Sequence, residues 1–126
     1  MVGFVVISHS ARLAEGVVDL TKMMAPDVPI AAAGGLEDGS YGTSFDRICS
    51  AIEQVYSDEG VILLVDMGSA VMTAEMVIEA MEGRKLRIAD CPVAEGAVAA
   101  TVSAKIGMGM EEILQDLAEV GMQKKL

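Results

Sequence analysis

The sequence predicts an α/β fold, a small doubly wound and mainly parallel sheet of four strands with flanking helices. Short apolar runs alternate with segments of helical hydrophobic periodicity along the whole chain. Thirteen glycines among 126 residues suit the many tight turns that such an alternation needs. Because a helical segment separates each strand from the next, we expect parallel pairing with right-handed crossovers. Residues 1–126 are expected to form a single domain.

The first quarter of the chain predicts a strand, a helix and a second strand. Residues 2–7 form an apolar run that predicts the first strand. Residues 11–24 follow with helical spacing, and their predicted buried stripe consists of Leu13, Val17, Leu20 and Met24. Two prolines then separate this helix from a short apolar run at residues 30–33, which predicts the second strand.

A long glycine-rich loop, residues 34–42, follows the second strand. Thr43 is then a suitable N-cap for a second helix, with Asp46 three residues later as a variant capping box. The predicted buried stripe of this helix consists of Ile48, Ala51, Ile52 and Val55.

The second half of the chain repeats the alternation. Residues 61–65 form an unbroken aliphatic run, typical of a central strand that is buried on both faces. A helix is predicted over residues 70–81, with a C-terminal stop at Gly83. Residues 86–89 predict the fourth strand, and two more helices are expected at residues 93–106 and 110–120. The first of these two helices is rich in alanine, which suits close packing on the sheet or against a second subunit.

The composition of the chain disfavours several classes of binding partner and site. The net charge of −10 argues against binding to nucleic acid or to anionic membranes, and suits a basic protein partner. No secretion signal and no apolar run of about 20 residues is found, so a cytoplasmic protein is expected. Cys49 and Cys91 are isolated and expected to be reduced, and one histidine without clustered thiols predicts no metal site. Most of the ten methionines are expected in the core.

The chain's one histidine, His9, lies between the first predicted strand and the helix after it. That position is the carboxyl end of a parallel strand, where open α/β sheets bind ligands. It is also a helix N-terminus, which favours an anion. A neutral imidazole there could accept a phosphoryl group and have its charge stabilised. The competing interpretation is a histidine that only caps the helix or lies on the surface.

Asp66 follows the third predicted strand, which is a plausible neighbour of the first strand at the switch point of the sheet. This would bring Asp66 near His9. A carboxylate bonded to one ring N–H fixes the tautomer and directs the other nitrogen at a phosphoryl donor, so Asp66 is predicted to orient His9. A helix-capping role for Asp66 is the alternative, and both roles are compatible. We expect phosphate-binding groups at Ser8, Ser10, Gly34, Gly35, Gly68 and Ser69.

Other catalytic motifs are absent. The glycine loop is neither a dinucleotide-binding nor a P-loop pattern, and no nucleophile-elbow serine occurs. Glu37-Asp38 and Asp90 do not form an acidic cluster, which disfavours an aspartyl-phosphate receiver. Arg12 is more consistent with solvated surface than with a phosphate ligand.

Three segments together resemble the family of phosphotransferase subunits of bacterial dihydroxyacetone kinase, which is itself similar to the enzyme IIA domain of mannose-type sugar permeases. The segments are Ser8-His9-Ser10 with Leu13-Ala14-Glu15-Gly16, then Gly34-Gly35 through Gly42-Thr43-Ser44, and Val65-Asp66-Met67-Gly68-Ser69-Ala70. The resemblance covers the whole chain. The residues after the glycine loop and after the aspartate favour the dihydroxyacetone branch over the permease branch.

The resemblance implies a phosphoryl relay that begins at phosphoenolpyruvate. Enzyme I and HPr would pass the group to His9, with Asp66 as its hydrogen-bond partner and, by analogy, Nε2 as the acceptor. The group would then pass to ADP held on the nucleotide-binding subunit of the kinase, which supports phosphorylation of dihydroxyacetone (glycerone). No cofactor would be bound permanently. The resemblance also implies a homodimer, and a chain that ends at Leu126 would depend on separate carriers.

Two other functions use the same histidine. One is a mannose-type enzyme IIA that passes its phosphoryl group to an enzyme IIB domain of a sugar permease. The other is a binding module in which phosphorylation of His9 signals to a regulator. A small-molecule-binding domain without covalent chemistry is the remaining alternative.

Overall fold

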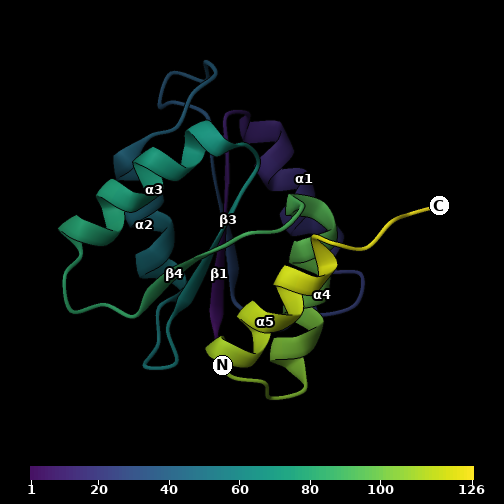
Figure 1. The fold of residues 1–126 in the computed structure, drawn as a ribbon. Coiled ribbons are helices and arrows are strands. Elements are labelled where there is room, and N and C mark those ends of the chain that lie inside the picture. The colour runs from purple at the N-terminus through teal and green to yellow at the C-terminus, as the bar shows by residue number, and fades with distance from the viewer.

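The computed structural model describes residues 1–126 and contains four strands and five helices. The elements in order are β1 Gly3–Ser8, α1 Ala11–Thr21, β2 Ile30–Gly34, α2 Phe45–Val55, β3 Val61–Val65, α3 Gly68–Ala80, β4 Leu86–Ala89, α4 Val93–Lys105 and α5 Met110–Val120. The strands form one parallel sheet in the order β2-β1-β3-β4 (Figure 1). The predicted fold class is confirmed, and each predicted strand and helix is present.

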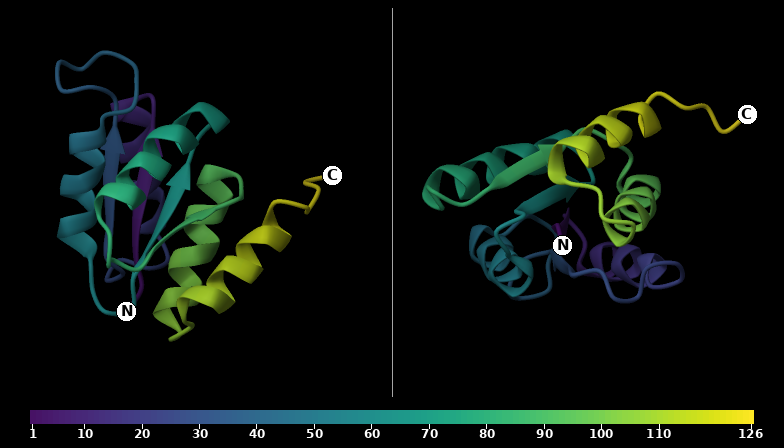
Figure 2. Two further views of the ribbon diagram at one scale, coloured as in Figure 1. Left: turned by 60° about the vertical axis from the view of Figure 1, so that its left-hand side comes forward. Right: turned by 90° about the horizontal axis from the view of Figure 1, so that it is seen from below.

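Helices cover both faces of the sheet (Figures 1 and 2). α2 and α3 lie on one face, whereas α1, α4 and α5 lie on the other. Right-handed crossovers explain the division, because the chain moves from β1 to β2 in one direction and from β2 through β3 to β4 in the other. The sheet therefore has its switch point between β1 and β3.

The core consists of two apolar layers separated by the sheet. Successive residues of β1 alternate between them, with Phe4 and Val6 facing α1 and α4, and Val5 and Ile7 facing α2 and α3. β3 is buried in the same way from Val61 to Leu64, as expected of a central parallel strand. The stripe predicted for α2 is also buried throughout.

The predicted stripe of α1 is largely wrong. Only Val17 of that stripe is buried, together with Ala14 and Thr21, whereas Leu20 is 41% exposed. The reason is the close approach of α1 to β2, since a Cβ added to Gly34 would come within 2.8 Å of the Ala14 Cβ. Small side chains therefore face the strand. The larger side chains Leu13 and Leu20 remain exposed, as does Met24 just after the helix.

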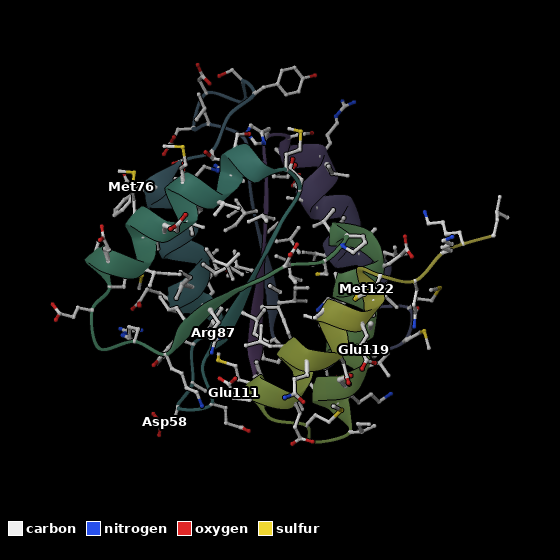
Figure 3. The ribbon with its side chains drawn as sticks, in the orientation of Figure 1. Asp58, Met76, Arg87, Glu111, Glu119 and Met122 are labelled. Atoms are coloured by element: carbon white, nitrogen blue, oxygen red, sulfur yellow. The ribbon has the colours of Figure 1, made fainter.

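The methionines are also mostly outside the core, contrary to the sequence-based expectation. Met110 is buried, but seven of the ten are exposed, namely Met1, Met23, Met24, Met67, Met72, Met76 and Met122. Figure 3 shows Met76 and Met122 on the outer surface of the molecule. The strands supply branched aliphatic side chains and the helices supply alanines, so the two closely packed layers leave little space for long, unbranched side chains.

α4 packs on the sheet face through its small residues, among them Gly96, Ala97 and Ala100. Its outer face forms an apolar groove with α1, of about 570 Å³, lined by Leu20, Met24, Ala94, Val98, Ala99 and Val102 with Glu95. α5 is joined to the edge strand by an ion pair of 2.8 Å between Arg87 and Glu111 (Figure 3). None of the helices is both long and apolar enough to cross a membrane.

Candidate functional site

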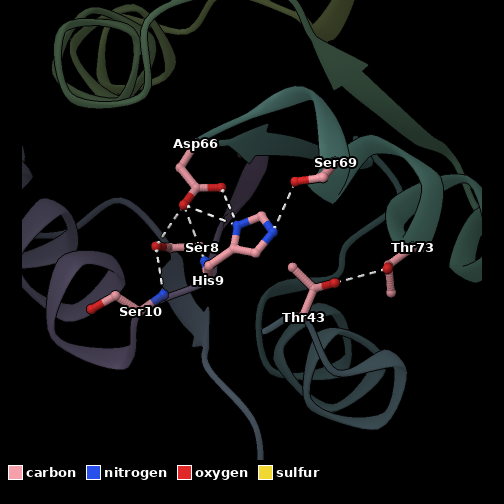
Figure 4. A network of polar contacts seen from close by, with 7 residues as sticks. All are labelled: Ser8, His9, Ser10, Thr43, Asp66, Ser69 and Thr73. Carbon is pink, nitrogen blue, oxygen red and sulfur yellow. Dashed lines mark hydrogen bonds and ion pairs between the residues drawn. The ribbon is translucent and has the colours of Figure 1, made fainter. Parts of the chain in front are cut away.

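The site lies at the carboxyl edge of the sheet, at the switch point. His9 follows β1 and precedes α1, and Asp66 follows β3. Because β1 and β3 are hydrogen-bonded neighbours, with Ile7 beside Val65, their next residues emerge side by side. Figure 4 shows the imidazole of His9 between Asp66 and Ser69. The sequence-based prediction that Asp66 lies near His9 is confirmed.

Asp66 holds both the ring and the backbone of His9. Its Oδ1 lies 3.1 Å from Nδ1 of the imidazole, and its Oδ2 accepts a hydrogen bond of 3.0 Å from the His9 backbone N–H. The carboxylate is 7% exposed and the imidazole 24% exposed. A carboxylate can only accept, so Nδ1 carries the proton and the lone pair of a neutral ring lies on Nε2. The nitrogen that carries the lone pair is thus the one that faces Ser69.

The environment of Asp66 keeps it ionised. Burial acts to raise the pKa of its carboxyl. This effect is outweighed by three hydrogen bonds to the carboxylate, from the His9 backbone, the Ser8 hydroxyl and the His9 ring, and by electrostatic attraction to that ring. The pKa of Asp66 therefore lies below its usual value. At neutral pH the carboxylate remains available as the acceptor for Nδ1–H.

Ser8, a predicted phosphate ligand, instead supports Asp66. Its side chain is completely buried, and its hydroxyl donates to Oδ2 of Asp66 over 3.0 Å. The Oγ of Ser8 also accepts a hydrogen bond of 3.0 Å from the backbone N–H of Ser10. Its one proton is donated to Asp66, so in this arrangement the hydroxyl has no proton left to donate to a phosphoryl oxygen.

Ser69 lies beside Nε2 of His9. Its Oγ lies 3.0 Å from Nε2 of His9, so its hydroxyl donates to the imidazole lone pair. Gly68 and Ser69 are the first two residues of α3, where backbone N–H groups have no partner within the helix. Met67 is the N-cap and makes no side-chain cap bond, so the helix-capping alternative for Asp66 is wrong.

Three other predicted phosphate ligands have mainly structural roles. Ser10 is the N-cap of α1 and accepts from the Leu13 N–H. The backbone N–H of Gly35 donates to the Ser8 carbonyl over 3.0 Å, so it is not free for a phosphoryl oxygen. Gly34 allows the close approach of α1, since an added Cβ would lie 2.5 Å from the Ser10 carbonyl oxygen. The parallel pairing of β1 with β2 continues past the last strand residues, which is why the Gly35 N–H bonds to the Ser8 carbonyl.

The N-cap of α2 is Ser44 rather than Thr43, so the predicted capping box is wrong. The Ser44 side chain accepts from the Arg47 N–H and donates to Glu37 over 2.6 Å. Thr43 instead forms a hydroxyl pair of 2.8 Å with Thr73 of α3, beside the imidazole (Figure 4). Sequence reasoning missed Thr73. Its spacing of four residues from Ser69, which puts both on one helix face, is the signal that could have found it.

The remaining titratable groups make no further centre. No group of three or more His, Cys, Asp or Glu side chains could hold a metal ion. Both cysteines are free thiols, and burial, with the nearby Asp90 charge, raises the pKa of Cys91 to about 11. Cys91 packs against Gly96, where an added Cβ would clash with the sulfur, and its raised pKa disfavours the thiolate form. Arg12 is exposed.

The fold and the sequence place the chain in the mannose-type EIIA class. Residues 3–114 match the EIIA-man family model, described as the PTS system fructose IIA component. A phosphotransferase system component EIIA from Streptococcus agalactiae has the same fold, with a TM-score of 0.72 and 11% identity over 97% of this chain and 93% of that one. A protein of unknown function superposes with a TM-score of 0.87 and 26% identity, covering 99% of this chain and 98% of that one.

Curated relatives define the branch. The chain is 42% identical to the phosphoryl donor subunit DhaM of PEP-dependent dihydroxyacetone kinase 1 from Listeria innocua, covering 94% of each chain. It is 37% identical to the phosphotransferase subunit DhaM from Lactococcus lactis, covering 97% of this chain and 98% of the relative. The chain belongs to the DhaM family of dihydroxyacetone kinase phosphotransferase subunits. DhaM of Klebsiella michiganensis is longer: the 36% identity covers 92% of this chain but only 26% of that protein.

Proposed function

We propose that this chain carries a phosphoryl group on Nε2 of His9, from phospho-HPr to ADP bound on the nucleotide-binding subunit of dihydroxyacetone kinase. The single observation that supports this best is the His9–Asp66 pair, which holds Nδ1 protonated and directs the lone pair of Nε2 outward. Membership in the DhaM family supports the branch, because the relatives are named as phosphoryl donor or phosphotransferase subunits of that kinase.

The first step is an exchange of one P–N bond for another. The Nε2 lone pair of His9 attacks the phosphorus of phospho-HPr, and the electrons of the breaking P–N bond return to the donor's imidazole. Ser69 must turn from the Nε2 lone pair, which its hydroxyl now contacts at 3.0 Å, and can then donate to a phosphoryl oxygen. The Nδ1 proton stays on the ring throughout, held by Asp66, whose charge balances the positive charge that develops on the imidazole.

The N-terminus of α3 would stabilise the transferred group. Gly68 and Ser69 present backbone N–H groups of a thirteen-residue helix at the side of Nε2. Such groups favour an anion both through hydrogen bonds and through the helix dipole. Of the residues predicted as phosphate ligands, Ser69 contacts Nε2 directly and Gly68 precedes it at the start of the same helix, while Ser8, Ser10, Gly34 and Gly35 support the surrounding backbone.

The second step reverses the first toward a different acceptor. An oxygen of the ADP β-phosphate attacks the phosphorus, the P–N bond to His9 breaks, and its electrons restore the Nε2 lone pair. ATP forms on the kinase subunit and becomes the phosphoryl donor for dihydroxyacetone. The chain itself needs no resident cofactor in this scheme, since phosphoryl transfer here depends on positioning and electrostatic stabilisation.

Intact mass spectrometry at neutral or alkaline pH tests the relay. The native chain is incubated with phosphoenolpyruvate, enzyme I and HPr, and the kinase subunit loaded with ADP is then added. We expect one phosphate to appear on the native chain, none on His9→Gln, and the phosphate to be lost when the kinase subunit is added. Arg12→Gln, at an exposed residue close to the site, is the matched control and should behave as the native chain does.

Other outcomes would redirect the function. A phosphate that forms on His9 and persists with the kinase subunit would contradict the dihydroxyacetone branch, and transfer to an enzyme IIB domain would identify the permease branch. A phosphate that neither partner removes would favour a regulatory module. No phosphate on the native chain, with carriers shown to be active, would contradict the whole proposal.

We further propose that the chain works as a homodimer. The supporting observation is the groove between α1 and α4, whose lining is apolar except for Glu95. Exposed apolar surfaces of this kind are typical of protein interfaces. Sedimentation equilibrium should give twice the chain mass, and Val98→Lys within the groove should give the monomer. A native monomer at high concentration would contradict the proposal.

A further inference from the structure

Three hydrogen bonds connect His9, the start of α3 and the end of the glycine loop. Ser69 at the start of α3 contacts Nε2 over 3.0 Å. Thr73, one turn further along the same helix face, is paired with Thr43 over 2.8 Å. The neighbour of Thr43, Gly42, returns to His9 through a backbone hydrogen bond of 3.0 Å to the His9 carbonyl. Figure 4 shows both threonines on the Nε2 side of the imidazole.

We propose that Thr73 is a positioning residue that acts through Thr43. Their hydroxyl pair sets the distance between the N-terminus of α3 and the end of the glycine loop, and thereby the space beside Nε2 that a phosphoryl group occupies. This inference rests on the proposed function for its effect on phosphoryl transfer. Its geometric part, the placement of Ser69 relative to Nε2, holds independently of that function.

The hydroxyl pair is the one specific connection between these segments. No other hydrogen bond joins α3 to the loop from Gly35 to Ser44. The remaining contact between α2 and α3 is made by apolar side chains such as Ile48, Ala70 and Ala74. Apolar burial is non-directional and permits small sliding movements, whereas a hydrogen bond fixes distance and direction. The pair is therefore what defines the register of α3 against the loop.

The function of this register is to fix the position of the start of α3 relative to Nε2 of His9. Ser69 and Thr73 belong to one rigid helix, so a shift of α3 at Thr73 also moves the Ser69 hydroxyl and the first N–H groups relative to Nε2. A displacement of about 1 Å of a positioning group can cost up to about 100-fold in rate. The part-buried hydroxyl pair, which joins α3 to the end of the glycine loop, therefore affects the chemistry at Nε2 as well as the stability of the chain.

Isosteric variants test the inference. Thr73→Val and Thr43→Val each remove one hydroxyl and keep the side-chain volume, while Thr73→Ser keeps the hydroxyl. Thr101→Val is the matched control, because Thr101 is completely buried and its hydroxyl bonds only to carbonyls of its own helix. Two quantities are measured for each: the rate of phosphorylation by phospho-HPr, and the ¹⁵N chemical shift of Nε2 in the unphosphorylated chain.

We expect about a 10-fold lower rate in Thr73→Val and in Thr43→Val, with a changed Nε2 shift that reports a weakened Ser69 contact. The double variant should be no slower than either single variant, because both remove the same interaction. Thr73→Ser keeps the hydroxyl, so its phosphorylation rate and Nε2 shift should match those of the native chain. Thr101→Val should also leave both quantities unchanged.

Two results would overturn the inference. One is a native rate and a native Nε2 shift in Thr73→Val. The other is an equal loss in Thr101→Val, which would show a general effect of a lost buried hydroxyl. If the native chain accepts no phosphate, the proposed function fails, and the Nε2 shift alone still decides whether Thr73 positions Ser69.

Discussion

Asp66 contacts His9 at two separate points with its two carboxylate oxygens: Oδ1 lies 3.1 Å from the ring Nδ1, and Oδ2 lies 3.0 Å from the backbone N. One side chain directly after β3 thus fixes both the orientation of the imidazole and the position of the chain as it leaves β1. The ring cannot rotate without losing the first contact, and the loop cannot shift without losing the second. This double attachment is the basis of the first prediction.

Asp66→Asn should leave the chain folded and slow phosphoryl transfer to His9 by about 10- to 100-fold, the usual effect of losing a partner that orients a histidine ligand. The amide replaces one of the two accepting oxygens with an NH₂ group, which can only donate, so the contacts that Oδ1 and Oδ2 now share with the ring and the backbone N–H depend on a single oxygen. Stopped-flow or quench measurement of phosphorylation by phospho-HPr provides the rate. Asp58→Asn, at an exposed position far from the site, is the control (Figure 3). An undiminished rate in Asp66→Asn would show that the pair has no orienting role.

The pKa of Asp66 predicts a contribution to acid stability. Because its pKa is lower in the folded chain than in the unfolded chain, ionised Asp66 stabilises the fold above the unfolded pKa, and this contribution is lost as the pH falls through the lower, folded value. The free energy of unfolding of native chain and Asp66→Asn should therefore converge as the pH falls below about 4. Urea titrations across that range provide the comparison, and a difference that is constant with pH would contradict the assignment.

Ser8→Ala should destabilise the chain by about 1 to 3 kcal/mol, because it leaves the part-buried Ser10 N–H without its acceptor and removes a donor from Asp66. The pKa of Asp66 should rise with the loss of that donor. Urea unfolding measures the stability. Ser50→Ala, on the exposed face of α2, should change it by less than about 0.5 kcal/mol. Equal stabilities of Ser8→Ala and the native chain would be inconsistent with the buried hydroxyl network.

Two glycine variants should have opposite effects. Gly34→Ala places a Cβ 2.5 Å from the Ser10 carbonyl oxygen, so α1 must move away from β2, at a cost of about 1 to 3 kcal/mol. Gly16→Ala lies within α1 with open space around the new Cβ and should stabilise the chain by about 0.5 to 1 kcal/mol. Thermal unfolding compares them. A neutral Gly34→Ala would mean that α1 does not depend on this close approach.

The sequence is sufficient to predict the elements and the neighbourhood of His9 because both depend on local pattern and on general rules of parallel sheets. Apolar runs locate the strands, and the switch point brings the residues after β1 and β3 together. Details that depend on exact distances were not predictable. Whether Thr43 or Ser44 caps α2 depends on which hydroxyl meets the Arg47 N–H, and both residues have suitable side chains.

The same limit applies to side-chain burial and to the phosphate ligands. Leu20 follows the helical period but is exposed, because the distance between α1 and β2 admits only small residues. Ser8 and Gly35 have the residue types of phosphate ligands, yet their polar groups are used by Asp66 and by the β1–β2 pairing. Residue type indicates what a group can do, whereas its partners in the fold determine what remains free.

The most direct test of the account is the ¹⁵N spectrum of the imidazole before and after phosphorylation with phosphoenolpyruvate, enzyme I and HPr. The chain has one histidine, so the ring signals need no assignment among several residues. We predict that Nε2 of His9 becomes bonded to phosphorus and that Nδ1 remains protonated, as its contact with Asp66 requires. A phosphorylated Nδ1, or a ring that is unchanged while another residue gains the phosphate, would contradict the account.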